Sequence, residues 1–183
     1  NDGSLNSNTA TVTVTVAAVN DTPVSSAVSA STNEDTAKAI TLDGSDVDTG
    51  DTLTYSLVTS PSNGTASISG ATATYTPDSN WNGTDTFTYR ANDGSLNSNT
   101  ATVTVTVAAV NDAPVSSAVS ASTNEDTAKA ITLSATDVEG SSLTYSIVSN
   151  PSNGSLGSVS GTSVTYTPDS NWNGTDTFTY RAN

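Results

Sequence analysis

The residues of this chain that are best able to do chemistry are acidic, and they stand in short groups. The groups are Glu34-Asp35, Asp46-Val47-Asp48, Asp78-Ser79-Asn80, Asp93, Asn111-Asp112, Glu125-Asp126, Asp137-Val138-Glu139 and Asp169-Ser170-Asn171. Ca²⁺ binds six to eight hard oxygen ligands at about 2.3–2.6 Å, which separate loops can supply. An Asp-x-Asp or Asp-x-Glu loop can place two carboxylates on one side of the chain, able to share one ion. The pattern predicts Ca²⁺ ligation; the competing interpretation is a solvated surface charge that keeps an extracellular protein soluble.

The overall charge favours a divalent cation as the counter-charge. The chain has 4 Lys and Arg against 18 Asp and Glu, a formal net charge of −14. Nucleic acids and anionic membrane surfaces both attract cationic faces, so this composition argues against either partner. No hydrophobic run is long enough to span a bilayer, which argues against membrane insertion of this segment.

Enzyme chemistry fails on the residue inventory. The chain holds no His and no Cys, which removes the usual bases, thiols and transition-metal ligands. Paired carboxylates alone could hydrolyse glycosides. Here, however, they recur with each repeat, and only 5% of the residues are aromatic, too few to form a sugar cleft. We therefore predict that the chain is not an enzyme.

An internal repeat decides the question of the fold. Residues 92–133 copy residues 1–42 with a single substitution, Ala113 in place of Thr22. Pro23 and Pro114 are 91 residues apart, and so are Trp81 and Trp172. Between these markers the distance between equivalent residues changes by one and then returns to 91. Loops tolerate such a change in length, whereas strands would lose their register.

Each repeat contains short segments with the two-residue period of β-strands. Residues 100–107 alternate between Thr and a small apolar residue, and residues 86–91 alternate likewise. Apolar residues at the same spacing mark further strands at Leu53, Tyr55 and Leu57, at Ile40 and Leu42, at Ile68, and at Ala73 and Tyr75. Asn-Gly, Ser-Gly and Asp-Gly pairs provide turns between them. This alternation, with no helical period anywhere, predicts half-buried antiparallel sandwiches.

The repeat divides the chain into three parts. Residues 1–20 are expected to hold the final strand and linker of a preceding repeat, with the strand at residues 10–17. Residues 21–111 form a complete repeat, and residues 112–183 form a repeat without its final strand. The chain opens at Asn1 and contains no methionine, so we expect a processed product or an excised segment.

Two origins for the missing strand remain open. The chain is either a window on a longer polypeptide, or a head-to-tail filament subunit in which residues 9–18 complete the last domain of a neighbour by donor-strand complementation. In both cases the last repeat must obtain a strand from elsewhere, because the edge of its sheet would otherwise be open.

The ordered set of motifs resembles a known family. The set runs Asn-Glu-Asp, Thr-Asp-Val-Glu-Gly, Leu-Thr-Tyr-Ser-Ile, Phe-Thr-Tyr-Arg-Ala-Asn-Asp-Gly, Val-Thr-Val-Thr-Val and Val-Asn-Asp-Ala-Pro, and it covers nearly the whole chain twice. It is similar to the cadherin-like tandem repeats of giant bacterial surface adhesins. The resemblance implies an all-β fold of tandem cadherin-like, immunoglobulin-like Greek-key sandwiches, with about seven strands per repeat.

Cadherin-type junctions bind Ca²⁺ between consecutive domains, and the resemblance implies two such sets of ligands here. The junction between the repeats would use Glu34, Asp78, Asn80, Asn111, Asp112, Asp137 and Glu139. The preceding junction would use Asn20, Asp21, Asp46, Asp48 and Asp93. The linker is one residue shorter than in cadherins, Ala109 stands where an Asp is usual, and Asn80 replaces a usual carboxylate. We expect one or two ions per junction.

Other conspicuous residues receive structural interpretations. Asp43, Asp51, Asp85 and Asp176 are predicted to be surface charges; Asp43 and Asp51 have no acidic counterpart in the second repeat. Trp81 and Trp172 are expected to cap the ends of the sandwich cores rather than to stack on sugars.

These inferences lead to one functional prediction and one alternative. The chain is predicted to be a structural, Ca²⁺-rigidified segment of an extracellular bacterial adhesin stalk or surface filament, with neighbouring repeats or subunits as its head-to-tail partners. The alternative is an adhesive module that binds a glycan or a protein directly. If the chain is only a structural segment, a glycan or cell-surface partner would be bound elsewhere in the full protein.

Overall fold

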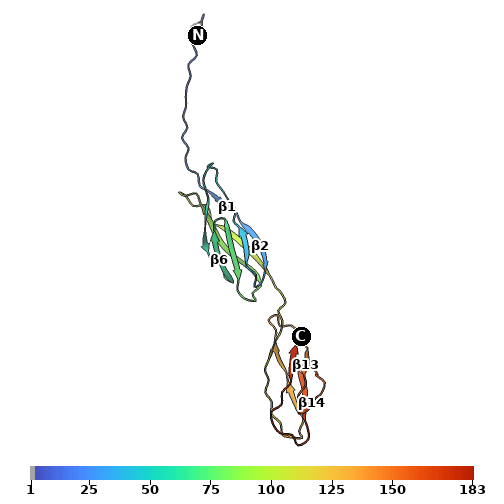
Figure 1. Ribbon diagram of the computed structural model, residues 1–183. Helices are drawn as coiled ribbons and strands as arrows, with labels where there is room; N and C mark the ends of the chain where they lie inside the picture. Colours follow the sequence, from blue (N-terminus) through green and yellow to red (C-terminus); the bar gives the residue numbers. More distant parts are fainter. Residues whose placement is uncertain (1–2) are drawn as a thin grey trace. The chain divides into compact units, whose positions relative to one another are not determined.

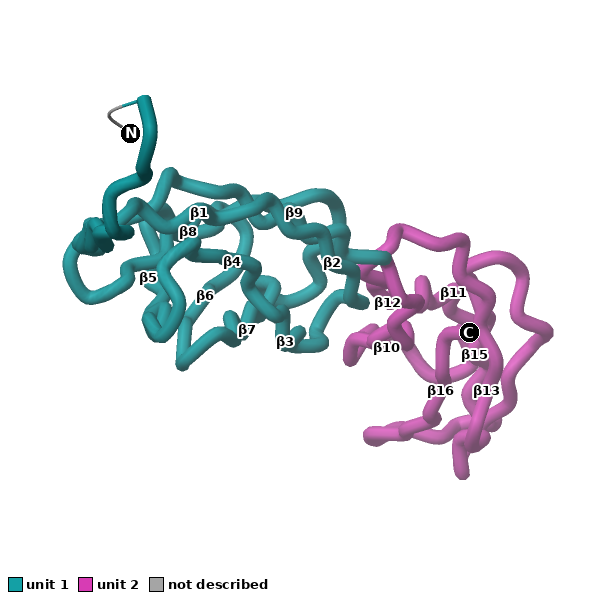
Figure 2. Tube along the Cα trace, turned by 90° about the horizontal axis from the view of Figure 1, so that it is seen from above, with its two compact units in different colours: residues 1–108 teal, residues 109–183 magenta. Residues whose placement is uncertain are grey.

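The computed structural model describes residues 3–183 and forms two compact units, residues 1–108 (unit 1) and residues 109–183 (unit 2) (Figure 2). Residues 1 and 2, which the sequence assigned to a preceding repeat, lie outside the described residues. The regular structure of the described residues consists of strands, which confirms the predicted all-β class. In the part of the chain that is described, no helix is long and apolar enough to cross a membrane.

Unit 1 is a sandwich of two sheets (Figure 1). Its strands are β1 (Val24–Ser25), β2 (Val28–Asn33), β3 (Lys38–Thr41), β4 (Gly44–Ser45), β5 (Thr54–Thr59), β6 (Gly64–Ser69), β7 (Thr72–Pro77), β8 (Gly83–Asn92) and β9 (Ala101–Ala108). One sheet has the order β2-β9-β8-β5 and the other the order β3-β7-β6, while β1 and β4 form a separate short pair. The two larger sheets hold seven strands, close to the number that the resemblance implied, and the short pair adds two more.

The core of unit 1 lies between these two sheets. Strand β9 contributes Val103 and Val105, both 0% exposed, because the Val and Thr residues of this strand face opposite sides of the sheet. Phe87 of β8 and Tyr75 of β7 stack across the core with their ring centroids 6.4 Å apart. Trp81 is partly buried and packs against the same cluster.

The pairing of β2 differs from the predicted antiparallel arrangement. Strand β2 pairs with β9 in parallel, with Val28 opposite Val103 and Asn33 opposite Ala108. Parallel neighbours require a long connection, and here the whole sandwich lies between the first and the last strand of the sheet. Local alternation cannot reveal this pairing, because it is the same for parallel and antiparallel strands.

Unit 2 repeats most of these strands. They are β10 (Val115–Ser117), β11 (Lys129–Thr132), β12 (Ser134–Thr136), β13 (Tyr145–Ser149), β14 (Gly154–Leu156), β15 (Ser163–Pro168) and β16 (Thr179–Ala182). Their sheets have the orders β10-β12, β11-β15-β14 and β13-β16. Leu133 and Val164 are 2% and 1% exposed, so unit 2 keeps part of the core.

Two strands of unit 1 have no counterpart among the described residues of unit 2, and the strand equivalent to β8 is much shortened. Unit 2 contains no strand equivalent to β9 or to β2, and β16 covers only the end of the segment that corresponds to β8. In unit 1, β9 is the one sheet neighbour of β2 and pairs with the first seven residues of β8, Gly83–Tyr89. Both defects therefore follow from a single cause, because the backbone of these segments has no β9-like strand to pair with.

The strand expected at residues 10–17 is not formed. These residues have no regular structure, and Val12, Val14 and Val16 are 85%, 77% and 87% exposed. Residues 10–17 have the same sequence, ATVTVTVA, as β9. The sequence favours a strand at both places, but only β9 has neighbouring strands with which to pair.

Asp85 is not the surface charge that the sequence predicted. It is 4% exposed, and its carboxylate accepts hydrogen bonds from the backbone N–H groups of Ser62 and Asn63 at 3.1 and 2.9 Å and from the Tyr75 hydroxyl at 3.1 Å. Burial acts to raise the pKa of Asp85, but these hydrogen bonds outweigh it and hold the pKa below its ordinary value. Asp176 in unit 2 is only half-buried, and its side chain accepts the equivalent bonds from Ser152 and Asn153.

Replacing Asp85 with Asn should destabilise unit 1 by about 1–3 kcal/mol at neutral pH, because an amide nitrogen would face donors that now meet a carboxylate oxygen. The lowered pKa means that the contribution of Asp85 is present above its unfolded pKa of about 3.9 and is lost as the pH falls through the folded value. Urea unfolding followed by Trp81 fluorescence, in a Trp172→Phe background, measures both effects. Asp43→Asn is the control with the same change of charge at an exposed site; equal losses in both variants would contradict the assignment.

Candidate metal centre

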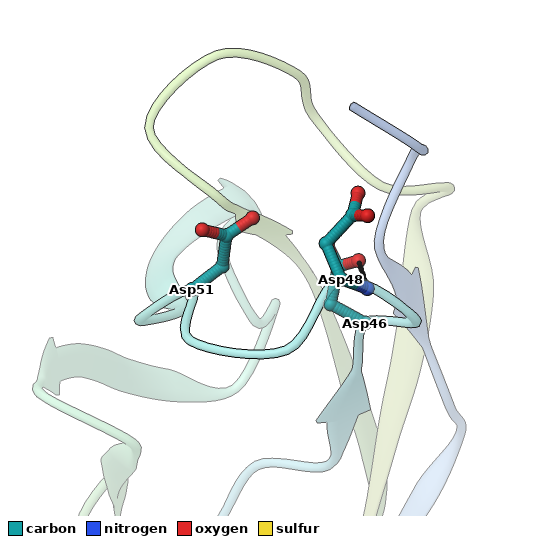
Figure 3. A group of neighbouring side chains, drawn as sticks. All are labelled: Asp46, Asp48 and Asp51. Carbon is teal, nitrogen blue, oxygen red and sulfur yellow. Dashed lines mark hydrogen bonds between the residues drawn. The ribbon is translucent and has the colours of Figure 1, made fainter. Parts of the chain in front are cut away.

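Three carboxylates meet in the loop that follows β4. One oxygen each of Asp46, Asp48 and Asp51 lies within 4.8 Å of the others. Figure 3 shows the three side chains on this one loop, with those of Asp46 and Asp48 next to each other. Oxygen atoms at this spacing can contact one cation together, whereas three carboxylates without a cation repel one another.

The backbone of the same loop holds Asp46 in place. The backbone N–H of Asp48 donates to Asp46 Oδ1 at 2.9 Å. Gly50 has a positive φ of 112°, and the turn at this residue brings Asp51 back toward Asp46 and Asp48. The second oxygen, Asp46 Oδ2, is buried and has no hydrogen-bond partner. A buried carboxylate oxygen without a donor is costly, and a bound cation would remove that cost.

The linker that leads into unit 1 joins this loop. The backbone N–H of Asp21 donates to Asp48 Oδ2 at 2.7 Å. The side-chain amide of Asn20 donates to Asp93 Oδ2 at 2.9 Å. The five residues predicted for the preceding junction thus lie in two connected groups, Asp21 with Asp46 and Asp48, and Asn20 with Asp93.

Asp93 is held by the turn in which it stands. Its Oδ1 accepts hydrogen bonds from the backbone N–H groups of Ser95 and Leu96 at 2.6 and 2.7 Å. The hydrogen bond from Leu96, followed by those from Asn20 and Ser95, lowers the pKa of Asp93 below its ordinary value. The side chain is therefore ionised at neutral pH, in the form that a Ca²⁺ ligand needs.

Unit 2 repeats the contact between linker and loop. The backbone N–H of Asp112 donates to Glu139 Oε2 at 3.1 Å, as Asp21 does to Asp48, and the Asn111 amide donates to the Asp112 carbonyl at 3.0 Å. Asp137 differs from Asp46, because its Oδ1 accepts from the backbone N–H of Ser141 at 2.9 Å. Ser141 stands where the first repeat has Asp51, so a third carboxylate is replaced by a backbone donor.

Glu34, Asp78 and Asn80, predicted for the junction between the repeats, stand in two loops of unit 1. Glu34 follows β2, is 3% exposed, and its backbone N–H donates to the carbonyl of Ala108 at the end of β9, at 2.9 Å. The backbone N–H of Asp78 donates to the carbonyl of Asn63 at 3.0 Å. The two loops are joined by a hydrogen bond from the backbone N–H of Asn80 to Asp35 Oδ1, at 3.1 Å.

The structure therefore divides the residues predicted for the junction between the repeats by unit. Glu34, Asp78 and Asn80 belong to unit 1, and Asn111, Asp112, Asp137 and Glu139 belong to unit 2. Within each unit the predicted residues stand in loops that hydrogen bonds join to one another. A shared ion between the units remains a prediction.

Sequence reasoning missed Asp51 as a member of the carboxylate group. It was assigned to the surface because its counterpart in the second repeat is a serine, and a lone acid outside the Asp-x-Asp motif carries no signal of its own. The turn at Gly50 brings it back toward the motif; a glycine in the sequence indicates a turn but not the direction in which the loop continues.

The donor set around Asp46 fits Ca²⁺ among the common metal ions. The side chains are carboxylates, with no nitrogen or sulfur ligand, which suits a hard cation. Asp46, Asp48 and Asp51 would hold the ion, and water would complete the six to eight ligands that Ca²⁺ takes.

Comparison with protein families identifies the repeats. The sequence model of the bacterial Ig domain matches residues 20–106 and 111–183, which is most of the chain. A comparison with curated protein sequences finds no significant match.

Solved structures with a similar fold include both adhesion proteins and an enzyme. Protocadherin gamma B2 extracellular cadherin domains 3–6 are 14% identical with a TM-score of 0.46, over 80% of this chain and 38% of that chain. The human desmocollin-1 ectodomain is 12% identical with a TM-score of 0.40, over 84% and 34%. An endo-fucoidan hydrolase from glycoside hydrolase family 107 is 24% identical with a TM-score of 0.41, over 88% and 26%. The chain thus spans well under half of each of these structures.

Replacing Asp46 with Asn should weaken Ca²⁺ binding at this loop by about tenfold or more, since losing even an indirect partner of a metal ligand lowers affinity about 10- to 100-fold. Isothermal titration calorimetry of Ca²⁺ binding measures the change. Asp43→Asn carries the same change of charge just outside the group and should bind as the unsubstituted chain does. Equal weakening in the two variants would show that only the overall charge matters.

Proposed function

Since this chain belongs to the bacterial Ig domain family in both of its repeats, we propose that it is a non-catalytic spacer, stiffened by Ca²⁺, in an extracellular stalk or filament. The family supports an extracellular structural or adhesive module. The finer assignment, to a calcium-stiffened spacer, depends on the acidic loops at the ends of the sandwiches.

The observation that carries the proposal is the group of Asp46, Asp48 and Asp51, whose oxygens lie within 4.8 Å of one another and which includes a buried oxygen without a hydrogen bond. This group is joined to the linker through the backbone N–H of Asp21. A cation bound there would contact the sandwich and restrain the linker that enters it. The group of carboxylates would thereby become a link between one repeat and the chain before it.

The same logic applies to the linker between the repeats. Asp112 and Glu139 repeat the contact of Asp21 and Asp48, with a Glu in place of the Asp. We propose that Asn111, Asp112, Asp137 and Glu139 act together with Glu34, Asp78 and Asn80 to hold Ca²⁺ at this junction. A net charge of −14 makes repulsion between acidic loops the main obstacle to aligned repeats, and divalent cations would cancel it.

Calcium would also raise stability, by an amount that grows with the logarithm of its concentration relative to Kd. A ligand that binds only the folded state stabilises it by about 2.7 kcal/mol at a hundredfold excess over Kd. A domain of this size, without disulfides, gains a large fraction of its total stability from such a term. The array would then be stiff only in the presence of extracellular calcium.

Near-identity of the repeats favours a spacer over an adhesive module. Residues 92–133 differ from residues 1–42 at one position, whereas a face that binds a particular glycan or protein is usually specialised. The partners proposed for this chain are accordingly neighbouring repeats.

Removing calcium with EDTA should lower the melting temperature of the chain and widen its distribution of sizes in small-angle X-ray scattering, because the ligands that restrain the linkers are lost. Differential scanning calorimetry and scattering, with and without excess Ca²⁺, measure the two effects. If chelation changes neither, the calcium role is wrong.

A pair of matched variants assigns the stiffening to the linker between the repeats. Asp137→Asn with Glu139→Gln should remove most of the calcium-dependent change in scattering and leave only the part that comes from the Asp46 group and the linker before it. Glu125→Gln with Asp169→Asn removes the same charge from unit 2 at residues equivalent to Glu34 and Asp78, which belong to no junction within residues 1–183. That control should respond to calcium as the unsubstituted chain does.

A further inference from the structure

Unit 2 has an apolar groove where unit 1 has its last strand. The groove has a volume of about 640 Å³ and is lined by residues that include Val119, Ala121, Ile131, Leu133, Phe178 and Tyr180. Their counterparts in unit 1 are Val28, Ala30, Ile40, Leu42, Phe87 and Tyr89, all of which belong to the core that includes Val103 and Val105 of β9 or pack against it. The groove of unit 2 is therefore the site that β9 fills in unit 1.

Exposure confirms this equivalence of the two sites. Tyr89 and Phe87 are 0% and 1% exposed under β9, whereas Tyr180 and Phe178 are only half-buried. Val119 is 39% exposed, although its counterpart Val28 packs against the core. The apolar surface that β9 covers in unit 1 is thus open to solvent in unit 2.

The chain carries a second copy of the strand that fits this groove. Residues 10–17 have the same eight-residue sequence as β9, and their three valines are at least 77% exposed. Clusters of exposed large apolar side chains on soluble proteins usually mark interaction sites. A groove and a strand that match residue by residue in unit 1 are here both exposed.

We propose that residues 10–17 of one copy of this chain bind in the groove of unit 2 of a second copy and act as its last strand. Repetition of this contact is head-to-tail, and a head-to-tail contact builds oligomers as open filaments or closed rings. The proposal does not rest on calcium, because residues 10–17 contain no acidic residue. A strand supplied by residues beyond 183 in a longer polypeptide would compete for the same groove.

The pairing of β9 in unit 1 predicts the register of the donated strand. In unit 1, Val103 lies opposite Phe87 of β8 and opposite Val28 of β2. Shifted by one repeat, Val12 of the donor lies opposite Phe178 and Val119 of the acceptor. The donor would pair antiparallel with the segment before β16 and parallel with residues 119–124, and both segments would become strands.

The first test is the state of association of the 183-residue chain, measured by sedimentation velocity over a range of concentrations. We expect oligomers that grow with concentration in both Ca²⁺ and EDTA. Val12→Asp with Val14→Asp should leave monomers, because both side chains face the groove. These residues are exposed and unpaired with any strand in unit 1, so the substitutions do not disturb its folding.

The matched control places the same two charges on the other face of the donor. Thr11→Asp with Thr15→Asp alters positions equivalent to Thr102 and Thr106, which are exposed in β9, and should assemble as the unsubstituted chain does. A monomeric unsubstituted chain, or equal assembly of the two double variants, would overturn the proposal.

A disulfide tests the register directly, because the chain has no cysteine of its own. Thr106 lies opposite Thr84 in unit 1, which predicts that Thr15 lies opposite Thr175 of a second copy. Opposite residues on paired strands have Cβ atoms about 4.5–5.5 Å apart, close to what a disulfide requires. A mixture of Thr15→Cys chains and Thr175→Cys chains should give a disulfide-linked dimer, and Thr15→Cys with the exposed Thr162→Cys should not. Equal yields would overturn the register.

A chain extended beyond Asn183 by a copy of residues 93–108 tests the groove as the acceptor. Its own added strand should fill the groove, so the extended chain should be monomeric and the melting temperature of unit 2 should rise. Continued formation of the Thr15–Thr175 link at the original yield would show that residues 10–17 bind elsewhere.

Discussion

The fold of each repeat depends on the pairing of its last strand. In unit 1, β9 lies between β2 and β8 in the larger sheet and places Val103 and Val105 in the core. Unit 2, with nearly the same sequence up to this point, forms neither a counterpart of β2 nor the first part of β8. Strand pairing in this sheet is therefore cooperative. Strand β9 is the hydrogen-bonding partner of both β2 and β8, and the core is covered only when all three strands are formed.

Calcium would act at the ends of the same sandwiches, where the sheets offer no partners. The carboxylates of the acidic loops repel one another. Hydrogen bonds from the linker backbone, such as Asp21 to Asp48 and Asp112 to Glu139, offset only part of this repulsion. Strand pairing and ion binding would thus be separate means of joining one repeat to the next. The first would use the apolar surface of the sandwich, and the second would use the charge of the acidic loops.

The strands and the core could be predicted because they depend on local alternation. The residues of β9 and of the end of β8 show the two-residue period plainly, and both are strands with one buried face. The same period carried a signal that was not used: Asp85 shares the inward parity of Phe87 and Tyr89, which is why it is buried. The parallel pairing of β2 and the approach of Asp51 to Asp46 could not be predicted, because they depend on contacts between distant segments and on the path of a loop.

A strand that occurs twice with one sequence has a consequence for how the array folds. The groove of unit 1 cannot distinguish residues 101–108 from residues 10–17 by any side chain, since the eight residues are the same. Only the short tether from β8 favours the local strand, through its effective concentration. Correct threading of such an array is therefore decided by distance along the polymer and by the order in which segments emerge during synthesis, and exchange between neighbours is its inherent folding error.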